Sequence, residues 1–300
     1  MSSSDRPPSL DPAAAARWAA RPVLQASSPW LHEEIASRMR ERLEFIRLQP
    51  QSWAHWEPLR GGVEAHRQLL QHYPKVPVWL VAAQAEEAQA VQSHTRAPWW
   101  RLARWTAPSA QWGTPPAGAV QMLWANMLLH HAADPQALIA AWHRALAVDG
   151  FLMFSCFGPD TLRELRQVYA QEGWPAPAHE FTDMHDWGDM LVHAGFAEPV
   201  MDMERITLSY ETPERLLAEL RELGRNLHVQ RFAGLRGRRW RAQLLQALQA
   251  LARPDEQGRL CLTFGVVYGH ALKPMARHKV QSESQIGLED MRQMLGAKRS

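Results

Sequence analysis

Residues 179–189 hold the densest group of side chains that can bind a metal ion: His179, Asp183, His185, Asp186 and Asp189. Their spacing matches none of the usual zinc ligand sets. It suits the start of a helix better, because Thr182 can cap the first turn and acidic residues there favour the positive end of the helix dipole. We therefore expect a helix and no metal here, with His179 just before it as a substrate or lid residue.

A second group of chemically capable residues is the basic stretch 235–243, in which four arginines surround Trp240: Arg236, Arg238, Arg239 and Arg241. A basic helix of this kind can dock an acidic protein surface or bind nucleic-acid phosphates, and it can also be a solvated helix face. Because the chain has one such patch and no aromatic platform beside it, we expect no nucleic acid. Docking to an acidic protein and a solvated face both remain open.

The elements that position these residues alternate along the chain between apolar strands and amphipathic helices. Strands are expected at 76–83, 118–129, 151–157, 199–210 and 258–273. Helices are expected at 29–48, 135–148, 161–173 and 182–196, with a basic helical block at 213–252. This alternation predicts an α/β fold with a doubly wound, mostly parallel sheet.

Composition limits the classes of function. The chain has 300 residues with 33 Lys plus Arg and 31 Asp plus Glu, so its formal charge of +2 gives no strong field toward nucleic acid or anionic lipid. Its two cysteines lie in apolar runs without a CxxC pair, which indicates buried thiols. With no apolar run of about 18 residues and no signal-peptide pattern, a cytoplasmic protein without membrane spans is expected.

The domain organisation follows from composition. Residues 1–12, rich in Ser and Pro, and the polar residues 274–300 are expected to be disordered tails. Residues 13–273 are then one domain, in which the helical block 213–252 is an insertion before the last strand. A monomer is expected.

The order of elements resembles that of a class I S-adenosylmethionine-dependent methyltransferase. The junction LAVDGFLMFS at 146–155 and HAGF at 193–196 carry this general likeness. Residues 154–165, 179–196, 210–226 and 262–273, with ANMLLHH at 125–131, resemble more narrowly the malonyl-acyl-carrier-protein O-methyltransferases of biotin synthesis. The resemblance spans most of residues 20–273 and implies a seven-stranded sheet with a helical N-terminal lid.

The resemblance implies that residues 55–74 occupy the position of the cofactor loop. The acidic residue of the family falls on Glu57, and its three glycines, which let backbone approach the cofactor, fall on Leu59, Gly61 and Val63. Gly62 is adjacent. Only the middle glycine is retained, so we expect S-adenosylmethionine to bind weakly or in an altered way.

The other cofactor contacts that the resemblance implies have also diverged. The acid that pairs with the ribose hydroxyls is missing at Ala82 and Ala83, with Gln84 just behind them. Gln121 stands where the third strand usually has Asp, and Asn126 fits the family pattern. Trp18 aligns with the Tyr that covers the cofactor.

The acceptor that the resemblance implies is the free carboxylate of a malonyl thioester on an acyl-carrier protein. This nucleophile is already an anion at neutral pH, so positioning dominates and a cationic or hydrogen-bonding clamp is expected. The candidate residues are His130, His131, Arg163 and His179, with Arg225 or Asn226 beside them. Arg163 can equally be a solvated helix residue, whereas the two adjacent histidines lie near strand ends, where ligands bind in such sheets.

Two functions remain open. The chain is either a carboxyl O-methyltransferase with a rebuilt cofactor loop or a non-catalytic homologue that binds an acyl-carrier protein or a pathway enzyme. In both, the basic stretch 235–243 can dock the acidic carrier.

Overall fold

The computed structural model describes residues 9–23, 27–95, 110–232, 234, 236–253 and 257–275. Of the two expected tails, residues 1–8 and 276–300 lie outside these ranges. Residues 9–12 differ from the expectation, because Leu10 is buried and pairs with His228 in an isolated bridge. Asp11 caps the first helix by accepting hydrogen bonds from two backbone N–H groups, so the ordered structure begins before residue 13.

One sheet organises the chain. Its strands are β1 (Trp53–Trp56), β2 (Val78–Val81), β3 (Gln111–Trp112), β4 (Val120–Ala125), β5 (Leu146–Phe157), β6 (Ala197–Tyr210), β7 (Ala252–Arg253) and β8 (Arg259–Leu272). They lie in the order β3-β2-β1-β4-β5-β8-β6, with the short β7 paired to β8 as an eighth strand beyond the seven expected. The strands from β3 to β5 are parallel, and β8 is antiparallel to both β5 and β6.

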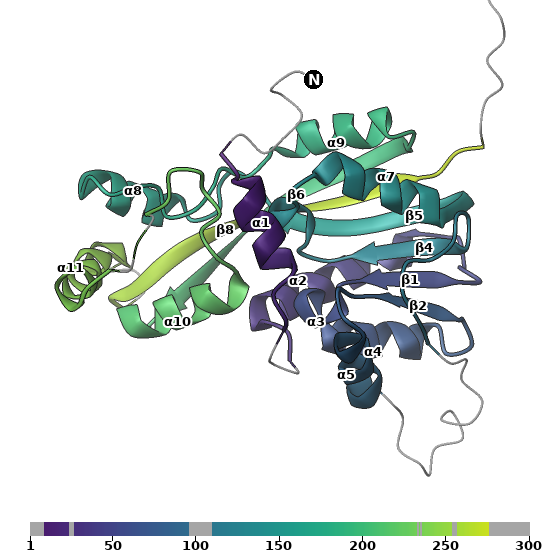
Figure 1. Ribbon diagram of the computed structural model, residues 1–300, viewed down its shortest axis with the longest axis horizontal. Helices are drawn as coiled ribbons and strands as arrows, with labels where there is room; N and C mark the ends of the chain where they lie inside the picture. The colour runs from purple at the N-terminus through teal and green to yellow at the C-terminus, as the bar shows by residue number, and fades with distance from the viewer. Residues whose placement is uncertain are drawn as a thin grey trace, which may run out of the picture.

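The helices cover both faces of the sheet and one end of it. They are α1 (Pro12–Ala19), α2 (Trp30–Glu41), α3 (Pro58–Gly61), α4 (Val63–His72), α5 (Ala85–Thr95), α7 (Pro135–Ala145), α8 (Arg163–Gln171), α9 (Met184–His193), α10 (Pro213–Leu223) and α11 (Arg238–Leu248). Three short 3-10 helices are η1 (Arg42–Phe45), η2 (Leu129–His131) and η3 (Gln249–Leu251). In Figure 1, α7 and α9 lie above the strands and α2 to α5 lie below them.

Successive side chains along each strand point to opposite faces of the sheet, so the core consists of two layers, one on each face. In β1, Trp53 faces the layer that contains α2 and α4, whereas Ala54 and Trp56 face the layer under α7 and α9. Trp142 and Trp187, both fully buried, fill the second layer from those two helices. Much of the tryptophan content is therefore packing mass, and both cysteines are buried.

The chain reverses its direction of growth across the sheet between β1 and β4. From β1 it proceeds to β2 and β3, and it then returns to the other side of β1 to form β4. The carboxyl ends of strands at such a switch point are where open α/β sheets bind ligands. A ligand site is therefore expected at the turns after β1 and β4.

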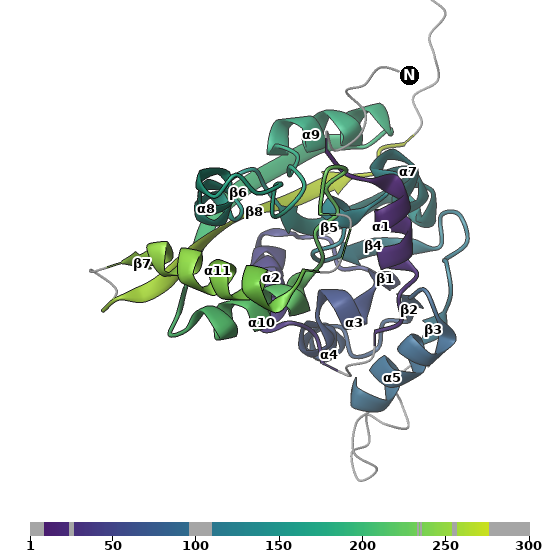
Figure 2. The same ribbon diagram turned by 60° about the vertical axis from the view of Figure 1, so that its left-hand side comes forward.

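The insertion between β6 and β8 consists of α10, α11 and η3. Figure 2 shows these helices beside the long β6–β8 pair, with α8 next to them. Thr212 caps α10 by accepting from the Arg215 N–H, and Pro213 occupies the first turn, where its missing N–H costs nothing. None of the described helices is long and apolar enough to cross a membrane.

Candidate functional site

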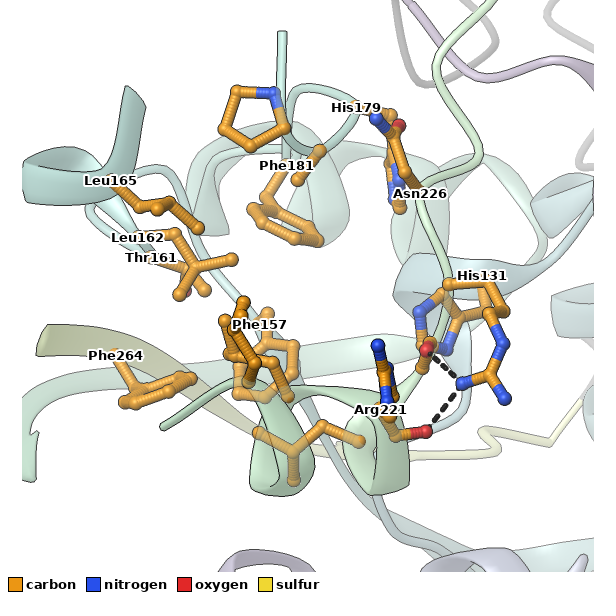
Figure 3. A pocket seen from close by; sticks show the side chains of 17 residues that line it. His131, Phe157, Thr161, Leu162, Leu165, His179, Phe181, Arg221, Asn226 and Phe264 are labelled. Atoms are coloured by element: carbon orange, nitrogen blue, oxygen red, sulfur yellow. Dashed lines mark hydrogen bonds between the residues drawn. The ribbon is translucent and has the colours of Figure 1, made fainter. Parts of the chain in front are cut away.

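A cavity of about 220 Å³ lies between the loop after β5, the segment before α9 and the insertion helix α10. Figure 3 shows that its two sides differ in character. One side is apolar and is formed by aromatic and leucine side chains, among them Phe157, Phe181, Phe264 and Leu162. The other side is polar and is formed by His131, His179, Arg221, Arg225 and Asn226. A pocket with an apolar wall and a few convergent polar groups suits a small acyl group with a charged end.

Histidines from separate segments meet at the polar side. The ring centroids of His130 and His131, in η2 after β4, are 4.0 Å apart, and that of His179 is 5.9 Å from His131. The His179 Nε2–H donates to the His130 carbonyl at 2.8 Å, and the Phe157 N–H donates to His130 Nδ1 at 3.3 Å. His32 joins the group from α2, with its ring 6.3 Å from Phe157. The structure thus brings together three of the four residues predicted for the acceptor side.

These histidines are neutral at physiological pH. Burial lowers the pKa of His179 and of His32 to about 4. Burial is also the main cause that holds the pKa of His130 and of His131 well below 6.5. The cluster can donate or accept hydrogen bonds without adding positive charge to the interior.

Positive charge is instead concentrated at the mouth of the cavity. Arg221 and Arg225 line it from the end of α10, and both side chains are exposed. The Arg225 guanidinium donates to the Gly224 carbonyl at 2.7 Å, and neither arginine forms an ion pair with any described carboxylate. Burial, with the charges of Arg21 and Arg221, lowers the pKa of Arg225. Two neighbouring arginine side chains that have no carboxylate partner can together bind an anion.

The cofactor-loop position after β1 is a helical turn. Glu57 follows β1 in the left-handed conformation, with φ of 53°, and α3 begins at the next residue. Leu59 and Val63, which stand where glycines were expected, have buried side chains in the layer formed by α2 and α4. The two larger residues therefore fill the core without requiring the left-handed backbone that glycine permits.

The retained Gly61 and the adjacent Gly62 have steric roles. A Cβ on Gly61 would lie 2.8 Å from the Asn126 carbonyl oxygen, because the loop after β1 touches the end of β4 there. Gly62 has φ of 151°, and a Cβ there would lie 3.0 Å from Glu33 Oε2. Glu33 in turn accepts hydrogen bonds from the first N–H groups of α4, those of Glu64 and Ala65.

Asn126 holds this crossing point together. Its amide nitrogen donates to the carbonyls of His32, at 2.8 Å, and of Gly61, and its oxygen accepts from the Ser155 hydroxyl at 2.5 Å. The side chain is 1% exposed. Its hydrogen-bonding groups are occupied by protein, so it shapes the cofactor loop from behind.

Trp18 links the two halves of the site. The Arg60 guanidinium lies over its ring at 5.0 Å, and that of Arg225 lies over it at 5.4 Å. The ring also stands edge-on to His131, with centroids 6.1 Å apart. Arg60 further donates to backbone carbonyls at the end of α1 and beyond, including that of Ala19 at 3.4 Å. The lid helix is thereby tied to the cofactor loop.

Glu57 follows the carboxyl end of β1, and its side chain is 16% exposed. Burial raises its pKa to about 7, the nearby Glu87 charge adds to this shift, and Arg60, whose Nε lies 3.6 Å from Glu57 Oε2, opposes it. A cationic group bound beside Glu57 would favour its ionised form. Glu57 therefore suits the cationic part of a ligand.

Three other predicted residues lie in different surroundings. Gln84 is half-buried at the start of α5, near the loop. Gln121 lies at the amino end of β4, the opposite end from the cofactor loop, where its side-chain oxygen accepts from the Gln51 N–H at 2.7 Å. Arg163 is an exposed residue of α8 that pairs with Glu164 at 3.1 Å and does not line the cavity. These positions separate Gln121 and Arg163 from the site.

The segment 179–189 is the start of a helix, as its pattern predicted. Asp183, rather than Thr182, is the cap residue, and it accepts from the His185 N–H at 2.9 Å. Thr182 is buried instead. Within the described residues, no group of three or more His, Cys, Asp or Glu side chains could hold a metal ion.

The basic stretch forms α11, which packs on α8 and α10 at the outer side of the cavity wall. Arg238, Arg239 and Arg241 are exposed, whereas Arg236 lies over the Trp240 ring at 3.8 Å. The sequence indicated no aromatic platform here, and this was wrong in part: Trp174, from another segment, lies 5.5 Å from Trp240. Arg236 covers Trp240, so this ring is not open for a base to stack on it.

Sequence reasoning missed several residues of the site: His32, Arg60, Glu87 and Arg221. Each lies on a helix that the sequence predicted only as part of the core packing or did not predict at all. The one available signal was Arg60, a charged residue directly before the two glycines of the cofactor loop. The rest required the three-dimensional arrangement.

Comparison with known proteins identifies the family. No model of a known protein family matches the chain. The malonyl-[acyl-carrier protein] O-methyltransferase of Gallionella capsiferriformans is 39% identical over 264 residues, which are 84% of this chain and 87% of that protein. The protein of the same name from Halorhodospira halophila is 36% identical over 242 residues, 80% of each chain. That from Laribacter hongkongensis is 45% identical over 163 residues, 54% of each.

Solved structures support the fold. The YcgJ protein of Bacillus subtilis superposes with a TM-score of 0.53 at 10% identity, covering 80% of this chain and 99% of that one. A Bacillus halodurans protein assigned to the methyltransferases gives 0.52 at 12% identity, covering 80% and 100%. The sheet is thus of the class I methyltransferase type, and the chain belongs to the family of malonyl-[acyl-carrier protein] O-methyltransferases.

Proposed function

We propose that this protein transfers a methyl group from S-adenosylmethionine to the free carboxylate of a malonyl thioester carried by an acyl-carrier protein. The observation that carries the proposal is the two-sided cavity, in which an apolar wall leads to neutral histidines and unpaired arginines. Its volume of about 220 Å³ suits a short acyl group better than a drug-sized ligand. The names of the related proteins agree with this chemistry.

The residues at the switch point fit the cofactor. Gly61 lets the loop after β1 pack closely against the Asn126 carbonyl, and Glu57 offers a largely buried carboxyl group to a cationic ligand. The sulfonium cofactor would supply an intrinsically reactive methyl group. Glu57, the backbone of Gly61 and Gly62, Gln84 and Trp18 would hold it.

The residues of the chain contribute mainly positioning. Arg221 and Arg225 neutralise and orient the acceptor carboxylate, which needs no general base because it is already ionised. His131 and His179 are neutral and therefore place no additional positive charge beside a sulfonium. The apolar wall around Phe157 and Phe181 excludes water from the acyl group.

A direct test is to incubate the protein with S-adenosylmethionine and carrier protein charged with malonyl or acetyl groups. Intact-protein mass spectrometry should detect one added methyl group on malonyl carrier and none on acetyl carrier, which has no free carboxylate. Methylation of neither, or of both, would contradict the proposal.

Removing the arginine clamp should impair use of the substrate. Arg225→Ala is expected to lower kcat/KM for malonyl carrier by about tenfold to one hundredfold, because the carboxylate loses a hydrogen bond to a charged group. Binding of S-adenosylhomocysteine should change less than threefold. Arg215→Ala is the control, because Arg215 lies on α10, the helix that ends just before Arg225, in an exposed pair with Glu219 and does not line the cavity. Equal effects of the two substitutions would contradict the clamp.

We further propose that the exposed arginines of α11 dock the acidic carrier protein. The surface consists of Arg238, Arg239 and Arg241, and it lies one helix away from the cavity wall because α11 packs on α10. Surface charges of this kind act mainly on association rate and on its salt dependence.

The double charge reversal Arg238→Glu with Arg239→Glu is therefore expected to raise KM for malonyl carrier about tenfold at low ionic strength and to flatten its salt dependence. The kcat at saturation should be unchanged. Arg144→Glu, on exposed α7 at the other face of the sheet, provides the control. If the salt dependence of the double variant were the same as that of wild type, the proposal that α11 docks the carrier protein would be contradicted.

A further inference from the structure

Glu87 is a buried carboxylate that no packing requirement explains. It lies in the first turn of α5, the helix that follows β2, and its side chain is 4% exposed. One oxygen, Oε1, accepts from the Val23 N–H of the lid segment at 3.0 Å. The other, Oε2, is buried and has no hydrogen-bond partner among the described residues. A buried carboxylate oxygen without a donor is costly, which points to a donor supplied by a ligand.

The position of Glu87 indicates which donor. Helix α5 packs on α3, the turn of the cofactor loop, and the Glu87 charge acts on Glu57 at the end of β1. In open α/β sheets that bind nucleosides, a carboxylate associated with the second strand accepts hydrogen bonds from the ribose hydroxyls. Here the end of that strand carries Ala82 and Ala83, which have no such group.

We infer that Glu87 supplies the ribose-binding carboxylate from the first turn of α5, in place of the residue missing at the end of β2. This inference rests on the proposed function, since it concerns the nucleoside part of the same cofactor. Oε2 accepts from a ribose hydroxyl while Oε1 keeps its bond to the Val23 N–H, so one side chain serves the ribose and the segment after α1. Gln84, the earlier candidate, is then not the main ribose contact.

The test is calorimetric titration with S-adenosylhomocysteine and with its 2′,3′-dideoxy analogue. The wild-type chain should bind the dideoxy ligand about tenfold to one hundredfold more weakly. Glu87→Gln keeps an acceptor for Val23 but removes the charge, so it should weaken S-adenosylhomocysteine binding more than binding of the dideoxy ligand and should distinguish the two ligands less than wild type does. Glu86→Gln, at the exposed neighbouring position, should behave as wild type.

Three results separate the outcomes. If Glu87→Gln loses affinity for both ligands equally and still distinguishes them, Glu87 only anchors the lid and the inference is overturned. If the wild-type chain binds both ligands equally, the inference is overturned without need of a folded variant. If the wild-type chain binds neither ligand, the proposed function fails as well.

Discussion

Lowering the pH from about 7.5 to about 5.5 is expected to reduce the free energy of unfolding by about 4 kcal/mol or more, since about 1.4 kcal/mol is lost per buried neutral histidine. Burial lowers the pKa of His32 and His179 to about 4, and that of His66 to about 3. The unfolded chain binds protons on these groups below pH 6.5, whereas the folded chain does not. The stability they confer is therefore complete above pH 6.5 and is lost as the pH falls toward 4.

Other buried histidines act in the same direction. Burial holds the pKa of His55 well below 6.5, and its Nδ1 lies 3.0 Å from that of His66 in the layer under α4. Urea unfolding at a series of pH values measures the total. His66→Gln should reduce by about one the number of protons that the chain takes up on unfolding, so the free energy of unfolding depends less steeply on pH. His185→Gln, at an exposed position, should leave this slope unchanged. A flat profile between pH 7.5 and 5.5 would contradict neutral buried histidines.

Asn126→Ala is expected to destabilise the protein by about 3–5 kcal/mol, because three buried partners would lose their hydrogen bonds at once. The partners are the carbonyls of His32 and Gly61 and the hydroxyl of Ser155. This loss is a large part of the roughly 5–15 kcal/mol that stabilises a typical domain. Binding of S-adenosylhomocysteine should weaken too, since Asn126 fixes the carbonyl face of the cofactor loop.

Asn126→Asp separates hydrogen bonding from side-chain volume. The carboxylate can still accept from Ser155 but cannot donate to either carbonyl, so we expect it to be at least as destabilising as alanine. Gln89→Ala, on the exposed face of α5, controls for loss of an amide side chain. Urea unfolding measures the effect. If Asn126→Ala lowered the free energy of unfolding by less than about 1 kcal/mol, the value of a single hydrogen bond, the assigned network would be contradicted.

Apolar periodicity predicted most of the fold. The helix expected at 135–148 is observed at Pro135–Ala145, and the strand expected at 258–273 is observed at Arg259–Leu272. Periodicity missed the two-residue strands β3 and β7, which carry no periodic signal, and also the four-residue strand β1. The start of the ordered chain was missed because Leu10 and Asp11 are fixed by partners far away in the sequence, at Leu227 and His228.

The site was less predictable. His131 was a candidate because residues after strands gather at one edge of the sheet, and His179 was a candidate because it stands just before a helix; the structure places both at the cavity. For Arg163 the sequence left open a clamp role and a solvated helix position, and the structure shows the solvated position. The absent glycines predicted weak or altered cofactor binding, whereas the structure places the side chains of Leu59 and Val63 in the core. Glu87 and Arg60 matter through distant partners, Val23 and Ala19, which local pattern cannot reveal.

A loop with one of three expected glycines still forms a cofactor site in this protein. Isothermal titration of the wild-type protein with S-adenosylhomocysteine is the decisive experiment, because this product is expected to bind without the acceptor. We expect saturable binding in the micromolar range with one ligand per chain. No heat, together with no thermal shift at millimolar ligand, would contradict it and would favour a non-catalytic homologue that binds the carrier protein alone.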